Sequence, residues 1–199
     1  GCSSDLPLAE PLLTDPHPAV RLNAAVRIGR IWDIDREHFW QLIAQVLENE
    51  QNLTVIEHVL GDVVSRLIHS EQTRTVTLLL ALLHREPAGS DRAHRLCKAI
   101  ADKLTVLWVT YQSQEAKVVL DDWLAAPWEH PAEVRAILTT LSGAVVAGIG
   151  DDADKDADLR QRSRALVSTI VDAANARLAV HMTASNLDDD QTKEAREGA

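Results

Sequence analysis

The hydrophobic positions of the chain recur every three to four residues over most of its length, which is the period of an α-helix buried on one face. Residues 15–31 give the clearest example. Asp15 is expected to cap this helix, because its carboxylate can accept from the N–H groups of the first turn, and Pro16 is tolerated there. The apolar face consists of Val20, Ala24, Ile28 and Ile31. The small side chain of Ala25 beside Ala24 predicts a second helix packed closely against this one.

Similar apolar stripes predict further helices downstream. Asp35 and Asn52 are expected to cap the next two. The following helices are expected to begin near Ser70, Asp91, Ser113 and Pro131. A long last helix is expected over about 157–184, after an acidic linker at 151–158. Residues 104–111 are β-branched and aromatic and could form a strand, but their continuous helical period favours a helix.

The breaks between these helices indicate how the helices pair. They fall near residues 51, 90 and 129, so each pair spans roughly 35 to 40 residues, which is close to the period of helical-repeat proteins. One pair cannot bury its apolar faces alone, whereas stacked pairs can. The pattern therefore predicts an all-α fold, an α-solenoid of about four antiparallel helix hairpins with a long C-terminal helix. A compact helical bundle is the alternative.

The start of the first helix resembles a HEAT repeat of the type first described in phycobilisome lyases. The resemblance covers about a sixth of the chain and rests on TDPHPAVR at 14–21, followed by AA at 24–25 and IGRI at 28–31. HPAEVR at 130–135 repeats the opening with one residue inserted. The residues that match the repeat signature are Asp15, Pro16, Val20, Arg21, Ala24 and Ala25.

This resemblance implies a fold and a set of roles. The Asp-Pro would open the helix, the Val and the paired Ala would face the partner helix, and Arg21 would cap the helix or bridge to a neighbouring repeat. The domains expected on this basis are the end of a preceding repeat or a linker at 1–14, a HEAT-like domain at 15–185, and a flexible acidic tail at 186–199. The family is a scaffold class and implies no single activity.

Composition and charge exclude several kinds of protein. Hydrophobic residues make up 46% of the 199 residues, which is typical of a folded domain. The formal net charge of −10 argues against a dedicated nucleic-acid-binding protein, which would need Lys and Arg to neutralise phosphates. No apolar run approaches the length of a membrane span. Two cysteines, Cys2 and Cys97, suit a reducing compartment.

Common metal and cofactor motifs are missing from the sequence. Asp152, Asp154 and Asp156 have the first spacings of a calcium loop, but Ala157 and Ser163 stand where that loop needs Gly and Glu, so a solvated linker explains them better. No two histidines have the i, i+4 spacing of a helical metal site, and no phosphate loop or nucleophile elbow is present. We therefore expect neither a cofactor nor a metal.

One cluster of aromatic and acidic residues could form a groove. Its members are Trp108, Tyr111, Asp121, Asp122 and Trp123, with Trp128 close by. They resemble the residues with which HEAT-like alkylpurine DNA glycosylases hold a damaged nucleotide. That resemblance implies aromatic faces against a cationic base and a carboxylate beside the developing oxocarbenium charge. Those enzymes are basic, whereas this chain is acidic, and Trp108 and Trp123 fall in apolar stripes, so core packing is the favoured interpretation.

The sequence thus favours a non-catalytic scaffold or sensor segment, part of a larger cytoplasmic protein, similar to the helical arms of bacterial signalling ATPases. Its partner would be a protein or another domain of the same chain, and we do not expect nucleic acid. Two alternatives remain open. One is a nucleic-acid enzyme of the glycosylase type. The other is an envelope lipoprotein scaffold, because Gly1-Cys2-Ser3-Ser4 is similar to a lipoprotein cleavage junction with Cys2 as the lipidated residue.

Overall fold

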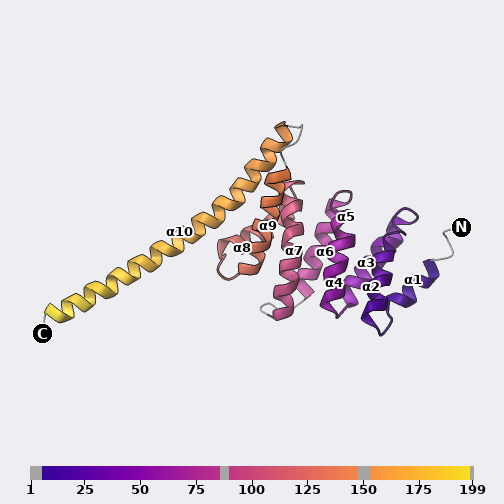
Figure 1. Ribbon diagram of the computed structural model, residues 1–199, viewed down its shortest axis with the longest axis horizontal. Coiled ribbons are helices and arrows are strands. Elements are labelled where there is room, and N and C mark those ends of the chain that lie inside the picture. Colours follow the sequence, from indigo (N-terminus) through magenta and orange to yellow (C-terminus); the bar gives the residue numbers. More distant parts are fainter. Residues whose placement is uncertain (1–5, 86–89, 148–152, 198–199) are drawn as a thin grey trace. The chain divides into compact units, whose positions relative to one another are not determined.

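A computed structural model describes the backbone of residues 6–85, 90–147 and 153–197, and the side chains of residues 10–85, 90–142 and 157–180. Over these ranges the chain forms helices joined by turns and contains no strand (Figure 1). The expected all-α class is therefore confirmed. The chain divides within one helix into two compact units, unit 1 (Gly1–Lys117) and unit 2 (Val118–Ala199).

Unit 1 contains the helices up to the start of α8. Their bounds are α1 (Leu6–Leu13), α2 (Pro18–Ile28), α3 (Arg36–Asn49), α4 (Leu53–His58), η1 (Val59–Val64), α5 (Ser65–Leu67), α6 (Gln72–Arg85) and α7 (Asp91–Val109). The segments α4, η1 and α5 follow one another without a break, and the middle one is a π-helix.

The contacts within unit 1 follow a regular order. Helix α2 packs against α3, and α6 packs against α7. In addition α2 contacts α4 and η1, α4 contacts α7, and α3 contacts α6. The helices α2, α4 and α7 therefore lie side by side in this order, and we call them the first helices (Figure 1). Helices α3 and α6 also lie side by side, and we call them the second helices.

The core of unit 1 lies between these helices. Ala25 is fully buried and Ala24 nearly so, as expected for a helix with close neighbours. Because a side chain no larger than a methyl group stands there, the backbones of α2 and its neighbours can approach closely. The largest fully buried side chains of this unit are Ile28, Phe39, Ile43, Leu47, Ile56, Leu60, Leu79, Leu96, Ile100, Leu104 and Leu107.

The caps of α3 and α4 are those that the sequence predicts. Asp35 Oδ1 accepts from the His38 N–H at 3.0 Å, and Asn52 Oδ1 accepts from the Thr54 N–H at 3.0 Å. Both side chains satisfy donors that the first helical turn leaves without a backbone partner.

The start of α2 corrects the expectation for Asp15. The N-cap is His17, whose Nδ1 accepts from the Ala19 N–H at 3.2 Å, and the helix begins at Pro18. Asp15 acts one turn earlier, where its Oδ1 accepts from the His17 N–H at 2.7 Å. Proline at position 18 explains the shift, because proline is favoured at the first helical position and disfavours helical backbone in the residue before it.

The ambiguous segment at 104–111 is helical up to the end of α7 at Val109. Leu104 and Leu107 are fully buried and Thr105 Oγ1 donates to the Ala101 carbonyl one turn back. β-Branched side chains lose rotamer freedom in a helix, which lowers their helix propensity. Here the hydroxyl bonds within its own helix and the apolar residues are buried on one face, and both offset that cost. The prediction of a helix here is confirmed.

Unit 2 contains the rest of α8 (Gln114–Ala125), α9 (Pro131–Ala147) and α10 (Ala153–Glu197), and α9 packs against α10. Helix α10 begins at Ala153, so the expected acidic linker is wrong from that residue onward. Its backbone stays helical to Glu197, through the segment expected as a tail. None of the helices in the part of the chain that the structure describes is long and apolar enough to cross a membrane.

Candidate functional site

Three arginines from three helices converge on the turn between α3 and α4, residues 47–52, which we call the α3–α4 turn. Arg21 comes from α2, Arg85 from the end of α6 and Arg92 from the start of α7. All three donate hydrogen bonds to groups of this turn. The turn is therefore held by side chains from α2, α6 and α7.

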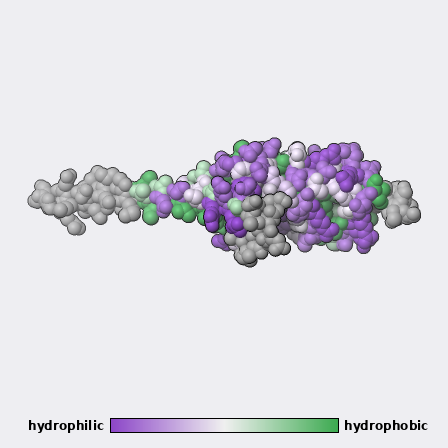
Figure 2. All heavy atoms as spheres, turned by 90° about the horizontal axis from the view of Figure 1, so that it is seen from above, coloured by the Kyte–Doolittle hydropathy of each residue, from purple (hydrophilic) through white to green (hydrophobic). Residues whose placement is uncertain are grey.

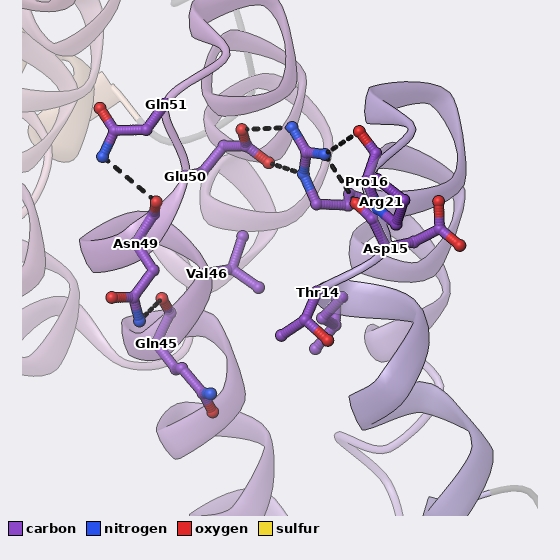
Figure 3. A pocket seen from close by; sticks show the side chains of 10 residues that line it. Thr14, Asp15, Pro16, Arg21, Gln45, Val46, Asn49, Glu50 and Gln51 are labelled. Carbon is purple, nitrogen blue, oxygen red and sulfur yellow. Dashed lines mark hydrogen bonds and ion pairs between the residues drawn. The ribbon is translucent and has the colours of Figure 1, made fainter.

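Arg21 and Glu50 form a two-pronged ion pair (Figure 3). The Arg21 Nε–H donates to Glu50 Oε2 at 2.7 Å, and Nη2 donates to Oε1 at 2.9 Å. Arg21 Nη1 donates to the carbonyls of Asp15 at 2.7 Å and Pro16 at 3.1 Å. This geometry matches the flat guanidinium to the flat carboxylate and fixes the orientation of both.

Burial sets the strength of this ion pair. The Glu50 side chain is 3% exposed and that of Arg21 is 19% exposed. Burial by itself raises the pKa of Glu50, but hydrogen bonds from Arg21 and from the Asn52 N–H at 2.7 Å, with the Arg21 charge, outweigh it and lower that pKa. The hydrogen bond to Glu50 likewise raises the pKa of Arg21. Both groups are thus held charged.

Arg85 and Arg92 contact the backbone of the same turn. Arg85 donates to the carbonyls of Leu47, of Glu48 at 3.0 Å and of Glu50 at 3.1 Å. Arg92 donates to the carbonyls of Gln51 and, at 3.1 Å, of Glu50.

Carbonyls at the end of a helix lack backbone partners and carry partial negative charge, so guanidinium groups stabilise them. Glu50 is therefore bound through its side chain by Arg21 and through its carbonyl by Arg85 and Arg92.

A cleft of about 340 Å³ opens beside the ion pair (Figure 3). Besides Arg21 and Glu50, it is lined by Leu13, Thr14, Asp15, Pro16, Gln45, Val46, Asn49 and Gln51. Asn49 Nδ2 donates to the Gln45 carbonyl at 2.9 Å and Gln51 Nε2 to the Asn49 carbonyl at 3.3 Å. Arg21 and Glu50 neutralise each other, and Asp15 adds a second carboxylate, which accepts from the His17 N–H. The other polar side chains of the lining are amides and a hydroxyl, so the cleft can accept and donate hydrogen bonds.

The signature residues of the first helix lie at one end of this cleft or in the core. Of these residues, Arg21 forms the ion pair with Glu50, and the carbonyls of Asp15 and Pro16 accept from Arg21. Val20 is half-buried, whereas Ala24 and Ala25 are buried.

The residues of the possible glycosylase groove fall in different units. In unit 1, Trp108 is half-buried with Lys117 Nζ 5.5 Å from its ring centre, and the Tyr111 hydroxyl lies 2.7 Å from His69 Nδ1. In unit 2, Trp123 is buried, and Asp121 and Asp122 are exposed.

A flipped base needs an open aromatic face. The Trp123 ring is buried and packs near His130, with ring centres 6.4 Å apart. The Trp108 ring is partly covered and already has a cation beside it. Neither indole therefore offers the wide stacking surface that the glycosylase interpretation requires.

Several other sequence candidates lie outside the described side chains. They include Cys2, the proposed lipidation site, and the calcium-loop aspartates Asp152, Asp154 and Asp156. Among the described residues no group of three or more His, Cys, Asp or Glu side chains could hold a metal ion.

The sequence analysis missed Glu50, Arg85 and Arg92 as a set. Each stands at a helix end, where a charged residue is ordinarily solvated, and nothing in their spacing connects them. The one available signal was the expected bridge from Arg21 to a neighbouring repeat, which required a buried carboxylate as its partner.

Comparisons with known proteins give no relative. No family model matches the chain, and neither a curated protein nor a solved structure is significantly similar to it.

Proposed function

We propose that the chain is a non-catalytic HEAT-like scaffold segment that binds a protein partner in a groove between α3 and α6. The partner is a separate protein or another domain of a longer chain. The observation that carries this proposal is an open apolar groove formed by two successive second helices.

The order of contacts supports a solenoid. First helices contact first helices along α2, α4 and α7, and second helices contact each other at α3 and α6. In a closed bundle every helix would share one central core, whereas in a stack each pair contacts only the pairs beside it. We therefore interpret unit 1 as stacked HEAT-like pairs, with the ion pair of Arg21 and Glu50 where the chain passes from α3 to α4.

The groove has the composition of a protein-binding surface. Its volume is about 420 Å³, and its lining is Ala44, Leu47, Glu48, Leu78, Ala81, Leu82, His84 and Arg85. Leu47 and Leu82 form a buried floor, whereas Ala44 and Ala81 are exposed to solvent. An apolar floor with a charged rim suits the apolar face of an amphipathic helix, which would place residues at i, i+3, i+4 and i+7 in the groove.

The small exposed alanines make a clean test. Ala44→Glu and Ala81→Glu each put a carboxylate where the partner would lie, and both positions are exposed, so stability should change by less than about 0.5 kcal/mol. Affinity-purified wild-type protein should retain a partner that the double variant loses. Calorimetry with that purified partner should show binding weakened about tenfold or more.

Ala165→Glu is the matched control, because Ala165 is an exposed helical alanine of α10 outside the groove. It should bind the partner as the wild type does. A partner that binds the groove variants and the wild type equally would refute the groove. A substrate turned over by the purified chain would refute the non-catalytic assignment.

A further inference from the structure

Helix α10 carries a second apolar stripe that does not face α9. The stripe turned toward the core of unit 2 includes Ser163 and Leu166, which are both buried. About a quarter of a turn away, Val167, Val171, Ala174 and Leu178 follow one another at intervals of four, three and four residues. This alternation is the spacing of a coiled-coil seam. Val171 is 50% and Leu178 is 59% exposed, and Figure 2 shows green, hydrophobic residues exposed along this helix.

Helix α10 is much longer than α9, and among the described residues this stripe remains exposed. Helix α9 has 17 residues and α10 has 45, so at 1.5 Å per residue they are about 25 Å and about 67 Å long. Over most of its length α10 therefore extends past the helix against which it packs. On the face of Leu166, Arg177 lies over the Trp128 ring at 4.4 Å, and Val180, which follows it, is 68% exposed.

Charged residues of opposite sign flank the apolar stripe of α10. Arg160, Arg162 and Arg164 precede the apolar stripe, and the sequence has Asp188, Asp189 and Asp190 after it. Arg164 and Asp188 stand equally far from Ala176 along the helix. Two copies of α10 paired in opposite directions about Ala176 would therefore place these arginines of each copy beside these aspartates of the other. A parallel pair would oppose like charges at both ends, which is unfavourable.

We propose that α10 forms an antiparallel coiled coil with α10 of a second copy of this chain, with Val167, Val171, Ala174 and Leu178 in the seam. In this register Leu178 of each copy packs against Ala174 of the other. Large residues thus meet small ones at the centre of the pair, as close packing of two helices requires.

The first experiment measures mass and affinity. Sedimentation equilibrium over a concentration series should give a species with twice the 21.9 kDa mass of the chain. Val171→Glu with Leu178→Glu would bury four carboxylates in the seam and should raise the dimer dissociation constant about a hundredfold. Both residues are exposed, so circular dichroism should be unchanged. Ala165→Glu, on another face of the same helix, is the matched control and should dimerise normally.

The second experiment tests the direction of pairing. Arg164→Glu alone, or Asp188→Arg alone, turns an attractive contact at each end into a repulsive one, and each should weaken the dimer about tenfold at low salt. The variant with both changes restores the attraction and should recover wild-type affinity. In a parallel pair each residue faces its own counterpart. Each single change would then replace one like-charge pair by another, and the double variant would show no recovery of affinity relative to the single variants.

Each outcome decides a part of the proposal. A monomer at every concentration would overturn it, and so would a dimer that Val171→Glu with Leu178→Glu leaves intact. A dimer that needs these residues but shows no rescue by the charge exchange would overturn the antiparallel arrangement.

Discussion

The substitution Glu50→Gln tests the ion pair that joins Arg21 of α2 to the α3–α4 turn. Glu50→Gln keeps the shape of the side chain and removes its charge. The amide oxygen can still accept one hydrogen bond from Arg21. The NH₂ group replaces the second oxygen, and because it is itself a donor, it cannot accept the other Arg21 N–H. The guanidinium then retains that one bond and its bonds to the carbonyls of Asp15 and Pro16.

The expected loss of stability follows from the interactions that Glu50→Gln removes. A hydrogen bond to a charged group contributes about 1.5–3 kcal/mol, and removing one partner of a fully buried ion pair costs about 3–5 kcal/mol. Arg21 is partly exposed and keeps two carbonyl acceptors, so the cost should lie in the lower part of that range or just below it. We expect Glu50→Gln to lower the free energy of unfolding by about 2–4 kcal/mol.

A double-mutant cycle separates the ion pair from other effects. Arg21→Met, Glu50→Gln and the double variant should give a coupling energy of about 1.5–3 kcal/mol. The matched control is the ion pair between Arg95 and Glu57, which also joins two helices but is exposed at 53% and 34%. Its coupling energy should stay below about 1 kcal/mol.

Urea unfolding followed by tryptophan fluorescence measures these energies, since Trp32 and Trp40 both lie in unit 1. The reasoning is refuted if Glu50→Gln unfolds within about 0.5 kcal/mol of the wild type. It also fails if the Arg21–Glu50 coupling is no larger than that of the exposed control.

The pH dependence of stability has a defined sign. Because the folded protein holds the pKa of Glu50 below its ordinary value of 4.5, folding favours the deprotonated carboxylate. This contribution is complete above pH 4.5 and is lost as the pH falls through the lowered pKa. Wild-type stability should therefore fall more steeply than that of Glu50→Gln below about pH 4.5, and parallel curves would contradict the assignment.

Three further predictions concern packing, the π-helix and activity. Ala25→Leu should destabilise the fold by about 1–3 kcal/mol, because Ala25 is fully buried, and an unchanged urea midpoint would show that α2 is not closely packed. Gly61→Ala should stabilise by about 0.5–1 kcal/mol, since a Cβ at this exposed helical position meets nothing within 4 Å, and a lower midpoint would mean that η1 needs glycine. The purified chain should release no modified base from DNA; release that Asp121→Asn or Asp122→Asn abolishes would favour the glycosylase alternative.

The helices were predictable because their causes are local. Apolar spacing and capping side chains act within one or two turns, and both operate where Asp35 and Asn52 begin their helices. The same locality explains the helix at 104–109, where the periodic pattern outweighed the strand preference of individual side chains. The shift from Asp15 to His17 is a competition between two local signals, in which the conformational constraint of Pro18 decided the boundary.

The convergence of Arg21, Arg85 and Arg92 on one turn, which we call the arginine cluster, was not predictable, because its causes are non-local. Glu50 lies 29 positions from Arg21 in sequence, and Arg85 and Arg92 approach the same turn from other helices. Residue type alone does not distinguish a buried charge with several partners from a solvated one at a helix end. The π-helix at Val59–Val64 also escaped detection, since its side chains keep an apolar period that an α-helix would share.

The α3–α4 turn and the groove between α3 and α6 share a residue, which connects stability to the proposed function. Arg85 lines the groove and donates to the carbonyls of Leu47 and Glu48, which are also groove residues. These hydrogen bonds fix the end of α3 relative to the end of α6 before any partner arrives. A groove whose walls are already fixed before binding loses little conformational entropy when a partner binds. The arginine cluster therefore acts on the proposed partner through the spacing of two helices, without any need for the partner to touch Arg21 or Glu50.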